Sequence, residues 1–291
     1  MKHTEAKRGI KLVLNFNKIE DYLNNNKVKL IIPSHIQYFQ YAMLVRMACK
    51  RKIKVLKLHS SDWGNSKFRL QKINHNHPSE MAKDFTKFRN IFKNLKDKNQ
   101  KYKLGKKIIN KRLSGKFDKS LSYMKQSSYL KKNNFKNKLF SSLKGKKLVV
   151  IFCHCFFDAP HKYRSMIFPD FYEQINHLLK LSEKYPKFIW IFKRHPNELP
   201  ENDVVYENIF KNKNNVYFIK NELNNYDLIK LNIKLAITDH GTVAHELTNY
   251  NIPVINTGDN LHIKYKFNFH AKSKKNLDNL IYNILINGKK A

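Results

Sequence analysis

The chain has 291 residues, of which 42% are hydrophobic, and a formal net charge of +35 at pH 7. This length and apolar content support globular domains with real cores and exclude a disordered or fibrous chain. The longest apolar stretch, residues 148–157, is interrupted by His154 and is too short to span a membrane. No signal-like apolar segment follows the N-terminus, so we expect a cytoplasmic protein.

The positive charge comes from 49 lysines and 8 arginines. Because bidentate recognition of phosphates and bases favours arginine, we do not expect nucleic acid as a partner. The charge is concentrated in residues 83–147, which hold 22 basic and 3 acidic residues. This stretch is either a solvated lysine-rich surface or a patch that contacts an acceptor or the anionic inner-membrane surface, where each lysine contributes on the order of 1 kcal/mol.

The cysteines and histidines do not predict a metal site. Cys153 and Cys155 flank His154 in one predicted strand, whose side chains alternate between two faces, and this favours packing over ligation. His75 and His77 have ligand-like spacing, but no nearby residue completes a set. We therefore expect neither a metal nor a cofactor.

The N-terminal part predicts one compact βαβ unit. Its strands are residues 28–32 and 53–58, and a helix with apolar spacing covers residues 36–49, with Ser34 placed to cap it. His35 follows the first strand. An imidazole with a pKa near ~6.5 suits proton removal from an acceptor hydroxyl, so His35 is a candidate catalytic base, although packed or solvent-facing histidines are commoner.

The rest of the chain changes pattern at the Lys/Asn-rich stretch 131–147, which predicts domains of residues 1–145 and 146–291. Residues 80–145 predict several basic helices with breaks at Gly105, Gly115 and Gly145. Beyond them strands and helices alternate, which predicts an α/β fold with a parallel sheet covered on both faces. The predicted strands are 148–153, 188–192, 216–219, 234–238 and 252–255, and the predicted helices are 169–184, 202–211, 224–231, 242–250 and 276–287.

Ligands of such sheets bind at the carboxyl ends of the strands, and the loop after strand 234–238 carries suitable groups. Gly241 lets a ligand approach the backbone, and the N–H groups of the following helix attract phosphate. Thr242 would cap that helix or donate its hydroxyl to phosphate. Glu246, one turn later, would accept hydrogen bonds from a ribose. The alternative is a simple helix cap beside a surface glutamate.

A second strand end carries Lys193, Arg194 and His195 before Pro196. Proline biases His195 toward an extended conformation, which points its imidazole along the sheet edge, where it would donate to a phosphate oxygen. Lys193 and Arg194 would add positive charge. A His-Pro pair alone is more often a turn, but its position one crossover before the glycine loop favours a site.

A third loop, after strand 148–153, supplies a carboxylate, an imidazole and a guanidinium within seven residues. Asp158 and His161 are candidate acid–base groups. The planar fork of Arg164 suits the carboxylate of an acidic sugar. The alternative is that Asp158 merely caps a turn before Pro160.

These motifs resemble those of the capsular and surface polysaccharide biosynthesis proteins, bacterial glycosyltransferase-like proteins of the GT-B type that include the Kdo transferases of capsule assembly. The resemblance rests on residues 158–161, 193–196 and 241–246 and extends loosely to Ser34-His35. It implies two Rossmann-like domains across a cleft, with the nucleotide on the C-terminal one. It also implies that His195, Gly241 and Thr242 contact the donor phosphate and that Glu246 contacts the ribose.

Two departures from the family pattern stand out. Lys-Arg-His-Pro replaces the commoner Lys-Pro-His-Pro, and the single βαβ unit predicts an incomplete N-terminal domain. The implied function is transfer of a sugar, Kdo-like and from a CMP- or other nucleotide-activated donor, to a surface polysaccharide or lipid-linked acceptor. The alternatives are a nucleotide-sugar epimerase of the double-Rossmann type and a non-catalytic basic protein that binds RNA or membranes.

Overall fold

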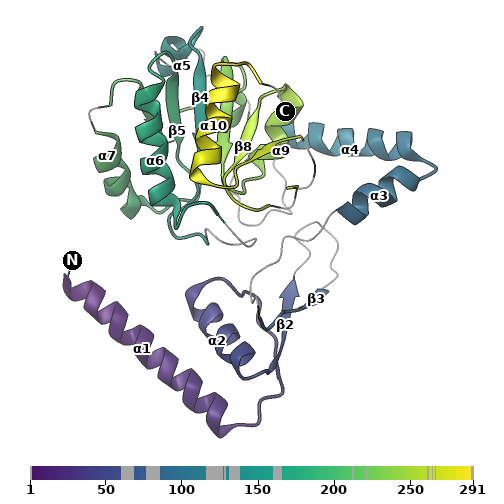
Figure 1. Ribbon diagram of the computed structural model, residues 1–291, viewed down its shortest axis with the longest axis vertical. Coiled ribbons are helices and arrows are strands. Elements are labelled where there is room, and N and C mark those ends of the chain that lie inside the picture. Colours follow the sequence, from purple (N-terminus) through teal and green to yellow (C-terminus); the bar gives the residue numbers. More distant parts are fainter. Residues whose placement is uncertain are drawn as a thin grey trace. The chain divides into compact units, whose positions relative to one another are not determined.

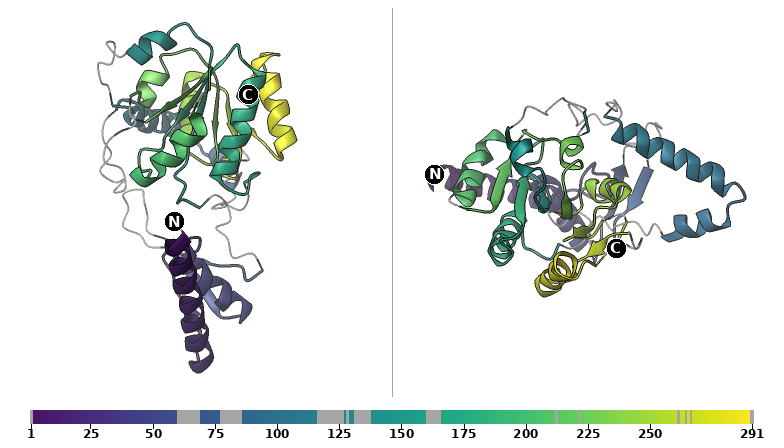
Figure 2. Two further views of the ribbon diagram at one scale, coloured as in Figure 1. Left: turned by 90° about the vertical axis from the view of Figure 1, so that its left-hand side faces the viewer. Right: turned by 90° about the horizontal axis from the view of Figure 1, so that it is seen from above.

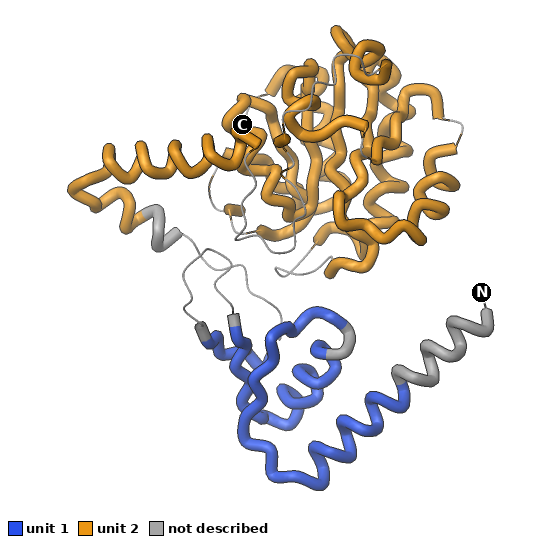
Figure 3. Tube along the Cα trace, turned by 180° about the vertical axis from the view of Figure 1, so that it is seen from behind, with its two compact units in different colours: residues 1–81 blue, residues 82–291 orange. Residues whose placement is uncertain are grey.

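The protein forms two compact units, residues 1–81 and 82–291 (Figures 1 and 3). The computed structural model describes residues 2–59, 69–76, 86–115, 127, 129–130, 138–159, 166–211, 213–220, 222–260, 262–263, 265 and 267–289. None of the helices in these ranges has the length and apolarity that crossing a bilayer requires.

Unit 1 contains the predicted βαβ unit and two further elements. Its elements are α1 (Lys2–Asn25), β1 (Leu30–Ile31), α2 (Phe39–Lys50), β2 (Lys54–His59) and β3 (Arg69–Lys72). Strand β1 is parallel to β2, which confirms the βαβ unit, and β3 is antiparallel to β2. The sequence pattern did not predict α1 or β3. The predicted cap at Ser34 is wrong, because α2 begins after Tyr38 and has no side-chain cap.

Among the described residues, three helices precede the sheet of unit 2: α3 (Thr86–Asn94), α4 (Lys98–Leu113) and α5 (Lys138–Leu143). Gly105 lies inside α4, so the predicted break there is wrong. A single glycine within a helix costs only about 1 kcal/mol and does not have to end it. Gly115 and Gly145 follow α4 and α5 with positive φ, the conformation that commonly ends a helix.

The predicted parallel sheet is confirmed in unit 2, in the order β6-β5-β4-β7-β8-β9. All its pairings are parallel. The strands are β4 (Leu148–Phe152), β5 (Ile189–Lys193), β6 (Val216–Ile219), β7 (Ile233–Thr238), β8 (Val254–Asn256) and β9 (Phe269–His270). The short β9 was not predicted.

Helices cover both faces of this sheet (Figures 1 and 2). One face packs on α6 (Phe171–Lys184), α7 (Asp203–Phe210) and α10 (Lys274–Leu285), around a core that includes Trp190 and Phe192. The other packs on α5, α8 (Asn225–Leu228) and α9 (Val243–Leu247). Two 3-10 turns, η1 (Pro200–Asn202) and η2 (Thr248–Tyr250), complete the unit. The result is the predicted α/β architecture.

The units divide after residue 81, whereas the sequence pattern placed the boundary at 145/146. The physical reason is that the end of α4 and the described residues that follow it are bonded to the sheet. Arg112 pairs with Glu246, and the Tyr129 hydroxyl donates to the same carboxylate at 3.0 Å. We call residues 112–115 together with 129–130 the anchor segment. The basic helices therefore belong with the sheet.

Gly115 offers a test of this anchor segment. A Cβ at Gly115 would overlap the carbonyl oxygen of Tyr129, whereas nothing lies within 4 Å of a Cβ at Gly145. Both glycines have positive φ, 82° and 79°, so alanine costs about 1 kcal/mol of backbone strain at either position. We expect Gly115→Ala to lower the midpoint of thermal unfolding more than Gly145→Ala in scanning fluorimetry. Equal shifts would contradict the described packing of Tyr129.

Candidate functional site

Three histidines lie at the carboxyl edge of the unit 2 sheet, one after each of three adjacent strands. His195 follows β5, His154 follows β4 and His240 follows β7. The ring centroid of His154 lies 6.4 Å from that of His195 and 4.3 Å from that of His240. We call these three side chains the histidine row. Sequence reasoning selected His195 but missed the other two.

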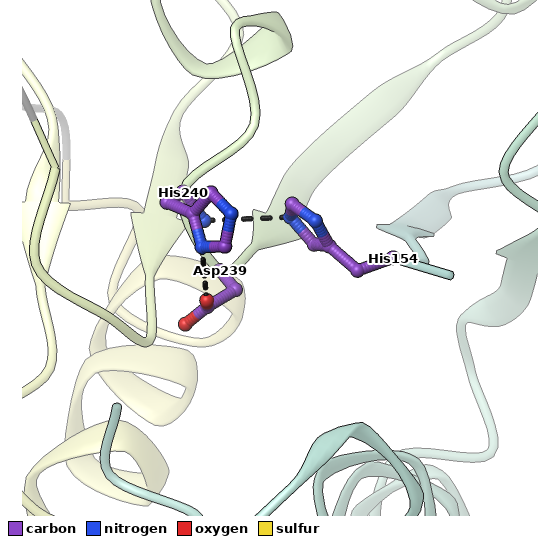
Figure 4. A group of neighbouring side chains, drawn as sticks. All are labelled: His154, Asp239 and His240. Carbon is purple, nitrogen blue, oxygen red and sulfur yellow. Dashed lines mark hydrogen bonds and ion pairs between the residues drawn. The ribbon is translucent and has the colours of Figure 1, made fainter. Parts of the chain in front are cut away.

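A buried carboxylate orients one end of the row (Figure 4). The side chain of Asp239 is 0% exposed, and its Oδ2 lies 2.5 Å from Nδ1 of His240. The hydroxyl of Thr257 donates to Asp239 Oδ1 at 3.3 Å and accepts from Nε2 of Gln174 at 2.7 Å. A carboxylate at Nδ1 fixes the proton on that nitrogen and gives Nε2 the role of base or acceptor.

His154 occupies the middle of the row as a neutral imidazole. Its Nε2 accepts from the backbone N–H of His240 at 3.4 Å, the contact drawn in Figure 4. Its ring stacks on Phe171 with 5.0 Å between centroids and 11° between planes. Burial, reinforced by the charge of His240, lowers the pKa of His154 to about 3. The ring therefore stays uncharged at neutral pH.

His195 is set up as a hydrogen-bond donor. Its Nδ1 accepts from the backbone N–H of Asn197 at 3.1 Å and lies 3.0 Å from Sγ of Cys155. Burial raises the pKa of Cys155 to about 12, so this thiol keeps its proton and donates. Burial also lowers the pKa of His195. With Nδ1 accepting, the single proton of the neutral ring is on Nε2.

The side chains of Lys193 and Arg194, the two cations before His195, are buried within unit 2. Nε of Arg194 donates to Asp203 at 2.8 Å, and its Nη2 donates to the carbonyl of Glu198 at 2.9 Å. Lys193 is buried too, and burial lowers its pKa to about 8. The charges of both residues nevertheless contribute to the lowered pKa of His195, so the two cations lie near the histidine row.

Gly241 and Thr242 adjoin the row. A Cβ on Gly241 would lie 3.7 Å from Nε2 of His154. The following helix, α9, has five residues and continues only as a 3-10 turn, so it is shorter than the predicted helix 242–250. Thr242 makes no cap hydrogen bond, and its hydroxyl accepts from Arg112 at 3.3 Å. So short a helix has a weak dipole, and attraction for an anion must come mainly from side chains.

Glu246 has both carboxylate oxygens engaged by the anchor segment. Arg112 Nε pairs with Oε1, and the Tyr129 hydroxyl donates to Oε2 at 3.0 Å. The side chain is 2% exposed. A ribose at Glu246 would compete with these partners, so the predicted ribose contact stays a prediction. Substitution of Glu246 would first disturb the anchor segment.

Asp158 lies close to the row, in the turn after β4. Its Oδ1 accepts from the backbone N–H of Ala159 at 2.8 Å. Its negative charge opposes the effect of burial on the pKa of His195. The other two candidates from this loop, His161 and Arg164, lie outside the described residues.

His35 belongs to unit 1. Its ring lies edge-on to those of Tyr38 and Tyr41, with centroid distances of 5.4 and 5.3 Å. Its side chain is exposed. These contacts are those of an imidazole at the surface of unit 1, and its catalytic role stays a prediction.

One set of side chains in the site could hold a metal ion. The ligand atoms of His154, Asp239 and His240 lie within 4.8 Å of one another. Two imidazoles and a carboxylate are a donor set of zinc and ferrous sites. Nε2 of His154 already accepts from the backbone N–H of His240, however, and Nδ1 of His240 already meets Asp239, so an ion held by these atoms would have to replace both contacts. The expectation that no metal is needed stays a prediction.

No known protein family and no curated protein matches the chain. Solved structures do resemble it. The β-Kdo 2,7-transferase KpsC of Thermosulfurimonas dismutans is 15% identical, with 97% of this chain and 92% of that chain covered and a TM-score of 0.46. The UDP-GlcNAc 2-epimerase of Methanocaldococcus jannaschii, solved with UDP-GlcNAc and UDP, is 18% identical, with 96% and 75% covered and a TM-score of 0.43. These likenesses are distant, and the sheet itself establishes the α/β architecture.

One buried and two half-buried histidines predict a loss of stability in mild acid. Burial lowers the pKa of His154 and His262 to about 3 and that of His270 to about 4. In the unfolded chain each titrates near ~6.5. The unfolded state therefore binds more protons below that pH, and stability present at neutral pH is lost as the pH falls. For His154 alone the loss is on the order of 2 kcal/mol at a pH of about 5.

We expect the free energy of unfolding, measured with urea, to fall steadily from about pH 7 to about pH 5. A His270→Asn variant should show a shallower slope, because one of the protons taken up on unfolding is removed. Its value at about pH 7 serves as the internal reference, since histidine protonation contributes little there. A flat profile in the wild type would contradict the neutral state of these histidines in the folded protein.

Proposed function

We propose that the chain is a glycosyltransferase of the GT-B type that binds the phosphate of a nucleotide sugar at the histidine row. The observation that carries this proposal is the meeting of three imidazoles at the carboxyl ends of three adjacent parallel strands. Ligands of doubly wound sheets bind at that edge.

The chemistry of sugar transfer suits these groups. As the bond to the sugar breaks, negative charge grows on the departing phosphate, and a fixed N–H donor stabilises it. Nε2–H of His195 is such a donor. A bound anion also raises the pKa of a nearby imidazole. The lowered pKa values of His154 and His195 would therefore rise when the phosphate binds. His240, oriented by Asp239, is suited to accept or return a proton.

The finer assignment follows the sequence resemblance at residues 158–161, 193–196 and 241–246. The donor would be a Kdo-like or other sugar activated by CMP or another nucleotide. The acceptor would be a surface or capsular polysaccharide or a lipid-linked glycan. Gly241 and Thr242 would lie beside the donor phosphate, next to His154.

A nucleotide-sugar epimerase is the second candidate, and the Asp239–His240 pair is the observation that favours it. Epimerisation needs a proton removed from a sugar carbon and returned to it, so an oriented imidazole would be central. Incubation of the protein with a bound nucleotide sugar, without acceptor, separates the two candidates by proton NMR. Appearance of an epimer would favour the epimerase, and an unchanged donor would favour the transferase.

A thermal-shift panel of CMP, CDP, UDP and GDP tests the proposal. We expect one nucleotide to stabilise the wild type, by about 2.7 kcal/mol at a concentration a hundredfold above its dissociation constant. His195→Ala and His240→Asn should lose that shift because they remove groups of the row. His177→Asn is the matched control, since His177 pairs with Asp278 between α6 and α10. If no nucleotide stabilises the wild type, or if His195→Ala keeps the full shift, the proposal fails.

A further inference from the structure

Unit 2 carries a strongly basic pair of helices, α3 and α4, which we call the basic hairpin (residues 86–113). It extends away from the sheet of unit 2 (Figures 2 and 3). No residue of α4 is buried. Across the hairpin, the sequence has 11 basic residues and the single acid Asp97: Lys87, Arg89, Lys93, Lys96, Lys98, Lys101, Lys103, Lys106, Lys107, Lys111 and Arg112. Of these cations Arg112 is already paired with Glu246.

The basic hairpin also exposes large apolar side chains. Ile91 and Phe92 are neighbours on α3, 54% and 41% exposed. Leu104 and Ile108 lie one turn apart on the same side of α4, 50% and 57% exposed. Solvated lysine helices do not need such side chains, and exposed apolar groups among charges are typical of an interaction surface.

We propose that the basic hairpin docks on the surface of an anionic lipid bilayer. Ile91, Phe92, Leu104 and Ile108 would enter the headgroup region, and the surrounding lysines would lie against lipid phosphates. Helix α3 is strongly amphipathic, and amphipathic helices with a basic face lie in the plane of the interface. Each lysine or arginine near an anionic leaflet strengthens binding about fivefold, the equivalent of about 1 kcal/mol.

Charge type favours lipid over RNA as the occupant. Nine of the hairpin's eleven cations are lysines, which attract phosphates as point charges rather than by the bidentate contacts of arginine. Base stacking on RNA would also call for several aromatic rings. Of the five large apolar side chains that the described part of the hairpin exposes, Phe92 and Tyr102 are aromatic, and the other three, Ile91, Leu104 and Ile108, are aliphatic. The proposal concerns a surface separate from the histidine row and does not depend on nucleotide binding.

Flotation with lipid vesicles tests this proposal on the full chain. We expect binding to vesicles of equal parts phosphatidylcholine and phosphatidylglycerol, little binding to phosphatidylcholine alone, and weaker binding at high salt. Ile91→Ser with Phe92→Ser should weaken binding about tenfold by removing apolar contacts. Lys103→Glu with Lys107→Glu should weaken it at least tenfold. The matched control, Lys272→Glu with Lys275→Glu, makes the same change in net charge at exposed lysines beside and within α10.

The control variant should bind the anionic vesicles nearly as well as the wild type. The proposal is overturned if the wild type ignores anionic vesicles, or if the control loses as much binding as the hairpin variant. It is also overturned if a single-stranded RNA displaces the vesicles and binds more tightly. Thermal unfolding confirms that each variant is folded. The thermal shift that a nucleotide causes is also measured on the hairpin variants. Because the two surfaces are separate, these variants should keep that shift, and loss of vesicle binding is then not confused with loss of nucleotide binding.

Discussion

The site depends on the parallel register of β4 with its two neighbours. Strand β4 pairs in parallel with β5 on one side and with β7 on the other. The parallel hydrogen-bond ladders align the carboxyl ends of the three strands. The residues that follow these strands therefore lie at one edge of the sheet, although they are far apart in the sequence. This is why His154, His195 and His240 meet. A slip of one residue would turn the side chains of a strand to the opposite face and disperse the row.

Asp239 converts this proximity into a fixed arrangement. A buried carboxylate is costly unless hydrogen bonds satisfy it, and here Thr257 and His240 do so. Gly258 is necessary at this point, since a Cβ there would overlap Oδ1 of Asp239. The ring of His240 is therefore oriented before any ligand arrives. Such preorganisation is what an electrostatic site requires, because the groups need not rearrange as charge develops.

Local pattern predicted the central strands of the sheet because each is a run of buried apolar residues bounded by polar loops. It could not predict β9, which has two residues, or α1, whose described side chains are mostly exposed and give no apolar stripe. In the site, the proline after His195 allowed the sequence to predict this histidine. The alternation of side chains along the predicted strand 148–153 instead led to the interpretation of His154 as a packing residue. The histidines beside His154 follow other strands, so the local sequence around His154 does not reveal them. The partner of Glu246 lies 134 residues earlier in the chain, at Arg112, and no local signal indicates it.

The central claim is that the histidine row binds a nucleotide phosphate, and NMR of the ring nitrogens of these histidines tests it most directly. Long-range proton–nitrogen spectra of the labelled protein distinguish the tautomers, and His→Asn variants assign the signals. We expect His195 to be protonated at Nε2 without ligand. The signals of the row should shift on titration with a nucleotide, while that of His177 stays in place. A proton on Nδ1 of His195, or nucleotide shifts confined to histidines outside the row, would contradict the account.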